Sequence, residues 1–92
     1  MTVKTLRHTI TITNPQGLHM RPIAAFVEAA GKFQSQVQVR KGEQPPINGK
    51  SAIHLLGLGA ECGAQLILEI TGPDAGSALK ELLDVLSRTV DD

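Results

Sequence analysis

The residues best suited to chemistry are His19 and Arg21, which lie two positions apart in the run from Asn14 to Pro22. Turn-forming residues followed by a proline in a first helical turn are typical of a loop that leads into a helix. The N–H groups at such a helix start favour an anion, as does the helix dipole. Arg21 adds a fixed charge and donors that suit phosphate oxygens. A ring nitrogen of His19 could therefore attack a donor phosphoryl group and hold the product against these donors.

The same residues have a plainer interpretation, in which His19 only caps the helix and Arg21 is a solvated side chain. A motif of this kind is a hypothesis until its strand-to-helix setting is confirmed. The three histidines, at positions 8, 19 and 54, have no metal-ligand spacing, and Cys62 has no sign of activation. There is no glycine-rich phosphate loop and no nucleophile elbow. We therefore expect neither a metal nor a cofactor.

Size and composition limit the fold and the partners. The chain has 92 residues, 41% of them hydrophobic, with 9 basic and 9 acidic residues. A chain of this size forms one domain, over residues 1–92, around one core. With zero net charge and no Trp or Tyr, it lacks the positive field and stacking rings of nucleic-acid binders. One cysteine, no leader pattern and no long apolar stretch predict a cytoplasmic chain without membrane insertion.

Alternation of apolar and polar residues predicts the strands. It covers residues 5–13, 35–41 and 64–71, and Ile47 begins a short further strand. In the first strand, one side of the alternation is formed by Leu6, His8, Ile10 and Ile12. Strands with one polar face belong to an antiparallel sheet that is open to water on that face.

Apolar spacings of three and four residues predict the helices. They cover residues 20–30, 52–56 and 75–86, with Ser51 and Asp74 as N-caps of the last two. The element order is β-α-β-β-α-β-α, and the helices must cover the apolar face of the sheet in an α+β fold. A ferredoxin-like split βαβ fold would suit much of this order as well, so the pattern leaves two topologies open.

Two runs of the chain resemble the signatures of one family. The run from Gly17 to Val27 resembles the active-site signature of HPr, the histidine-containing phosphocarrier proteins of the bacterial phosphotransferase system. The run from Asn48 to Gly59 resembles the second signature of the same family. The resemblance covers essentially the whole chain and fits both the sugar and the nitrogen branch. It implies an HPr-like open-faced β-sandwich, with a four-stranded antiparallel sheet and three helices on one face.

The resemblance also implies a role. His19 would accept and donate a phosphoryl group through Nδ1, and Arg21 would stabilise that group. The donor would be enzyme I charged by phosphoenolpyruvate, and the acceptors would be enzyme IIA domains that serve sugar uptake or its regulation. Such a chain is a monomeric carrier, not an enzyme.

Docking and regulation are expected around this site. An apolar patch for partners would use Met20, Ile53, Leu55, Leu56 and Leu58, with Arg21, Lys32 and Lys50 as rim charges. For Ile53 and Leu56, partner contact and core packing are nearly equal interpretations. Ser51 resembles the serine that HPr kinase phosphorylates in many relatives. The alternative function is therefore a regulatory binding module, switched at Ser51 and docking on a transcriptional regulator, with little phosphoryl flux.

Overall fold

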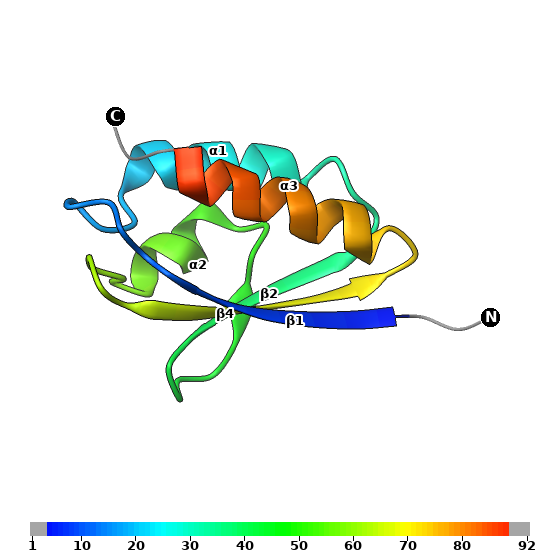
Figure 1. The fold of residues 1–92 in the computed structure, drawn as a ribbon, viewed down its shortest axis with the longest axis horizontal. Helices are drawn as coiled ribbons and strands as arrows, with labels where there is room; N and C mark the ends of the chain where they lie inside the picture. The colour runs from blue at the N-terminus through cyan, green and yellow to red at the C-terminus, as the bar shows by residue number, and fades with distance from the viewer. Residues whose placement is uncertain (1–3, 89–92) are drawn as a thin grey trace.

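A computed structural model describes residues 4–88 of the chain, and every predicted element is present (Figure 1). The observed ends differ from the predicted ones by no more than two residues. The elements are β1 (Lys4–Thr11), α1 (Met20–Ala30), β2 (Gln36–Lys41), β3 (Ile47–Asn48), α2 (Ala52–Gly57), β4 (Gln65–Gly72) and α3 (Ala75–Arg88).

The four strands form one sheet in the order β1-β4-β2-β3, and every neighbouring pair is antiparallel. A ferredoxin-like split βαβ fold would place β1 inside the sheet, with a strand on each side. Here β1 lies at the edge and β4 pairs with β2, so this order excludes the ferredoxin-like alternative. The helices lie on one face of the sheet (Figure 1). The predicted α+β architecture, an antiparallel sheet with its helices on one side, is therefore confirmed.

The core lies between the helices and the two inner strands, β2 and β4. Alternate residues of these strands are buried, as their pattern predicted. The largest fully buried side chains of the sheet and helices include Val37, Val39, Leu66, Leu68, Ile70, Ile23 and Leu82. Pro22 and Ile23 are both buried in the first turn of α1, so the core fixes the end of the helix where His19 stands.

β1 departs from its prediction in two ways. The strand ends at Thr11, although Ile12 still exchanges backbone hydrogen bonds with Gly63 and Ala64, at 2.7 and 2.8 Å. His8 was predicted on the apolar side but is exposed. The reason is that β1 is an edge strand, with a strand neighbour on one side only, and the helix layer covers it incompletely.

Asp74 stands directly before α3, at the predicted N-cap position, but its carboxylate also reaches another loop. It accepts hydrogen bonds from the backbone N of Gln34 and of Ser35, both at 2.9 Å, and from Ser35 Oγ. Ser35 is fully buried against Gly72, where an added Cβ would lie 2.5 Å from Ser35 Cα. Asp74 thus ties the loop between α1 and β2 to the start of α3.

This carboxylate gives a testable pH dependence. The hydrogen bonds from Ser35 Oγ and from Gln34 N lower the pKa of Asp74 below its usual 3.8. A carboxyl with a lowered folded-state pKa stabilises the protein above the unfolded pKa, and this contribution is lost as pH falls through the folded pKa. We expect Asp74→Asn to lower the urea midpoint at neutral pH, with a smaller difference from wild type below about pH 4.

The matched control is Asp84→Asn. Asp84 lies on the same helix, where its carboxylate pairs with Arg88 at 2.9 Å on the surface. An exposed pair of this kind contributes little, so Asp84→Asn should move the midpoint less than Asp74→Asn at neutral pH. A difference between Asp74→Asn and wild type that stays constant from neutral to acid pH would contradict the role of the ionised carboxylate.

Candidate functional site

The candidate site is carried by the loop that joins β1 to α1. The loop starts in a turn at Asn14, whose backbone C=O accepts from Gly17 N at 2.8 Å and whose Oδ1 accepts from Gln16 N at 2.9 Å. An Asn side chain that bonds the backbone two residues ahead is a common way to form such a turn. The turn brings the chain back toward the helix layer.

The far end of the loop is attached to the segment before β4. Leu18 is buried, and its N–H donates to the carbonyl oxygen of Ala60 at 2.9 Å. Gly17 has a φ of +73°, and a Cβ there would lie 2.6 Å from the same Ala60 oxygen. Only glycine fits this close approach without strain. His19, which directly follows Leu18, therefore has a fixed position.

His19 occupies the N-cap position of α1, but only its backbone takes part in the cap. Its φ and ψ of −98° and −172° are extended, and its C=O accepts from Ile23 N at 3.1 Å. The imidazole makes no capping hydrogen bond. The interpretation in which His19 only caps the helix is therefore wrong for the ring, which is partly exposed.

Asn14 is the ring's polar neighbour. Its Nδ2 lies 3.5 Å from Nε2 of His19, and only 7% of the residue is exposed. Asn14 was not predicted from the sequence as a neighbour of His19. Its one signal was the Asn14-Pro15 turn pair, which predicts a turn but not a contact five residues ahead.

The first turn of α1 supplies positive potential beside His19. The N–H groups of Met20 and Arg21 have no acceptor within the helix, because such bonds begin with Ile23. Pro22, the third residue of the helix, has no N–H to contribute. The Arg21 side chain is exposed. An anion on His19 would thus face two backbone donors and lie two residues from a guanidinium group.

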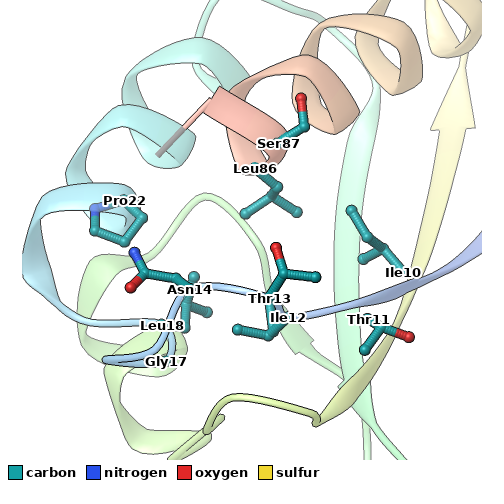
Figure 2. Close-up of a pocket in the computed structure, with 10 residues that line it drawn as sticks. All are labelled: Ile10, Thr11, Ile12, Thr13, Asn14, Gly17, Leu18, Pro22, Leu86 and Ser87. Carbon is teal, nitrogen blue, oxygen red and sulfur yellow. The ribbon is translucent and has the colours of Figure 1, made fainter. Parts of the chain in front are cut away.

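A cavity of about 230 Å³ lies behind the loop (Figure 2). It is enclosed by the end of β1, the loop and the last turn of α3. Its lining residues are Ile10, Thr11, Ile12, Thr13, Asn14, Gly17, Leu18, Pro22, Leu86 and Ser87. Asn14 lines the cavity, and the same side chain contacts His19.

The predicted docking residues divide into two groups. Met20, Ile53 and Leu56 are 53%, 82% and 51% exposed, which settles the balance between core and surface for the last two. Leu55 and Leu58 are buried in the core, so their placement in the patch was wrong. α2 packs against α1 at the end where Met20 begins the helix (Figure 1). We call Met20, Ile53 and Leu56 the apolar patch.

Two of the predicted rim charges are engaged elsewhere. Lys50 Nζ donates to the carbonyl oxygen of Phe33 at 2.8 Å, in the loop after α1. Lys32 Nζ pairs with Glu81 on α3 at 2.8 Å, which raises the pKa of the Lys32 ammonium. Arg21 lies two residues after His19, in the first turn of α1.

Ser51 occupies the predicted N-cap position of α2. Its Oγ accepts from His54 N at 3.3 Å, and the residue is half-buried. Within residues 4–88 there is no group of three or more His, Cys, Asp or Glu side chains that could hold a metal ion. No helix in the described part of the chain is long and apolar enough to cross a membrane.

Comparison with known proteins agrees with this geometry. The family model described as the PTS HPr component phosphorylation site matches residues 6–88. The phosphocarrier protein HPr of Treponema pallidum is 35% identical over 82 residues, which cover 89% of this chain and 88% of that protein. A multiphosphoryl transfer protein of Xanthomonas campestris is 40% identical over 76 residues, 83% of this chain but 9% of its own.

A solved structure gives the same result. HPr-C-His from Thermoanaerobacter tengcongensis superposes with a TM-score of 0.86 at 36% identity, covering 95% of this chain and 97% of the other. The similarity in fold and in sequence thus extends over nearly the full length of both chains. The chain therefore belongs to the HPr family, the phosphocarrier proteins of the phosphotransferase system.

Proposed function

We propose that the chain accepts a phosphoryl group on His19 from enzyme I charged by phosphoenolpyruvate, and passes it to enzyme IIA domains. The observation that carries the proposal is the His19 ring, which stands at the start of α1 without a capping bond. The lone pair of a ring nitrogen forms the bond to phosphorus while the bond from phosphorus to the donor breaks. The donor leaves with that electron pair. In the next transfer, an acceptor on the partner forms a bond to phosphorus, and the ring nitrogen of His19 leaves with its electron pair.

The surroundings support a carrier that turns over its own side chain. Arg21 and the first N–H groups of α1 offer charge and donors to the phosphoryl oxygens. A partly exposed ring on a loop can be reached by more than one partner. The match to a small part of a multiphosphoryl transfer protein supports a place in a series of phosphoryl transfers. The chain would accordingly act as a stoichiometric intermediate rather than as an enzyme.

The relay can be reconstituted. The chain is incubated with phosphoenolpyruvate and a cognate enzyme I, and then with an enzyme IIA domain of the same source. We expect one acid-labile phosphate on the chain, followed by its appearance on the IIA domain. Absence of label from a chain whose enzyme I is itself charged would overturn the proposal.

The apolar patch is proposed as the docking surface for both partners, with Arg21 supplying charge for acidic groups. Ile53 is the most exposed of the three side chains. Ile53→Ser should therefore leave the urea midpoint near that of wild type while raising the KM of enzyme I for the chain by on the order of tenfold. Gln65→Ser, at an exposed position of β4, is the control and should leave KM unchanged. An unchanged KM in Ile53→Ser would contradict the assignment.

Ser51 is proposed as a helix cap rather than as a switch. Its hydroxyl oxygen already accepts a hydrogen bond from His54 N, and this contact supports the capping role. The presence of both His19 and Arg21 at the start of α1 favours the carrier function over the regulatory module switched at Ser51, which would call on HPr kinase as a partner.

A further inference from the structure

The burial of Asn14 calls for a physical explanation. Asn14 is 7% exposed, although it lies in a loop and carries both a donor and an acceptor group. Burying an amide is unfavourable unless both groups find partners. The acceptor of Asn14 meets the backbone of its own turn, and its donor faces the ring of His19.

The turn decides which end of the amide faces the ring. A backbone N–H can only donate, so the Asn14 atom that lies 2.9 Å from Gln16 N is the oxygen. The NH2 group is then directed at His19, with Nδ2 at 3.5 Å from Nε2. Contacts at reacting groups are often long before the reacting partner is bound and shorten afterwards. Asn14 thus approaches Nε2 and not Nδ1, and the contact becomes a hydrogen bond only when Nε2 is unprotonated.

We propose that Asn14 is a positioning residue that keeps Nε2 of His19 unprotonated once Nδ1 carries the phosphoryl group, and so prolongs the life of the phosphorylated carrier. The inference rests on the proposed function, in which His19 is the phosphoryl acceptor. It assigns a role to a residue outside the Gly17 to Val27 run.

The chemistry follows from proton balance. When the Nδ1 lone pair bonds to phosphorus, the donor leaves with its electron pair, and a ring that still holds a proton on Nε2 carries a positive charge. Loss of that proton to water gives a neutral ring whose Nε2 lone pair accepts from Asn14 Nδ2. A ring that keeps the proton is the better leaving group, so water removes its phosphate sooner. A donor beside Nε2 slows this loss, and an acceptor would speed it.

The sharpest test is Asn14→Asp. The aspartate is nearly the same size and keeps an oxygen for Gln16 N–H, but it replaces the NH2 donor by an acceptor. The cavity of about 230 Å³ behind Asn14 leaves room for water around the new carboxylate (Figure 2). Both proteins are charged with phosphoenolpyruvate and enzyme I and freed of enzyme I. The acid-labile phosphate is then followed at neutral pH, where we expect loss roughly tenfold faster from the variant, as for one unit in the proton affinity of Nε2.

Two further variants distinguish the contact with the His19 ring from two other effects, the hydrogen bond within the turn and the added negative charge. Asn14→Ser keeps an oxygen acceptor for the turn, but its shorter side chain no longer reaches Nε2 of His19. Its phosphate should therefore be lost at a rate between those of wild type and Asn14→Asp. Asn48→Asp is the matched control. Asn48 Oδ1 accepts from Lys50 N at 2.9 Å in a similar turn after β3, so this variant adds the same charge and should keep the wild-type lifetime.

The outcomes are distinguishable. If the wild type is charged but both Asn14 variants lose phosphate at its rate, the role of Asn14 is overturned and the proposed function stands. If the wild type takes no phosphate from a charged enzyme I, both fail. A readout without variants is the ¹⁵N spectrum of the phosphorylated ring, in which we expect an unprotonated Nε2 at neutral pH. A protonated Nε2 there would also overturn the inference.

Discussion

His19→Ala is expected to remove acid-labile phosphate from the chain, with labelling by enzyme I reduced at least about a hundredfold, to background. The substitution removes the ring whose nitrogen would form the bond to phosphorus. It should leave the fold intact, because the imidazole makes no capping hydrogen bond and the backbone at the N-cap keeps its extended conformation. The measurements are the mass of the intact chain before and after acid treatment, and the urea midpoint.

The other two histidines provide matched controls. His8 and His54 are both exposed, on β1 and on α2. Their replacement by alanine should leave labelling at the wild-type level, since neither stands at the start of a long helix. If the label persists in His19→Ala and disappears in one of these two variants, His19 is not the acceptor and the other histidine is.

Gly17→Ala is expected to cost about 2–4 kcal/mol of unfolding free energy and to slow labelling of His19. Two penalties combine at this position. Gly17 has a φ of +73°, which is strained for any residue with a side chain. An added Cβ would also lie 2.6 Å from the carbonyl oxygen of Ala60 and 2.9 Å from Glu61 Cα, both of which are backbone atoms that cannot rotate away.

Gly42→Ala separates the two penalties. Gly42 has a similar φ of +58°, but an added Cβ would meet no atom within 4 Å. Its replacement should cost about 1 kcal/mol, which is the conformational penalty alone, and should leave labelling unchanged. Equal losses of stability in the two variants, measured by urea unfolding, would show that the contact with Ala60 contributes nothing.

Much of the fold could be predicted because its strongest signals are local. In β2 and β4 the period of two is unbroken, and both strands lie inside the sheet, where one face of each is fully covered. The pattern therefore reports burial directly. In α1 the apolar spacing, Pro22 and Gly31 agree on both helix ends. The strand-to-helix setting of His19 followed from these elements.

The remaining errors arise where burial depends on neighbours distant in the sequence. His8 continues the alternation of β1, but its exposure is set by the edge position of the strand. Leu55 and Leu56 are adjacent in a helix of six residues, which is too short for the period to reveal which side faces the core. The contact between Asn14 and His19 depends on the loop conformation, which the bond from Leu18 to Ala60 helps to set.

The attachment of the loop to Ala60 also determines when, during synthesis of the chain, the His19 loop can take its final conformation. His19 lies in the first part of the chain, whereas Ala60, which holds Leu18, and Ala64, which pairs with Ile12, follow α2. During synthesis the histidine is made well before the residues that fix its loop. A growing chain can therefore display the His19 ring but not yet hold it in place. On the proposed function, phosphoryl transfer at full rate would indicate that the later half of the chain has folded onto the earlier one.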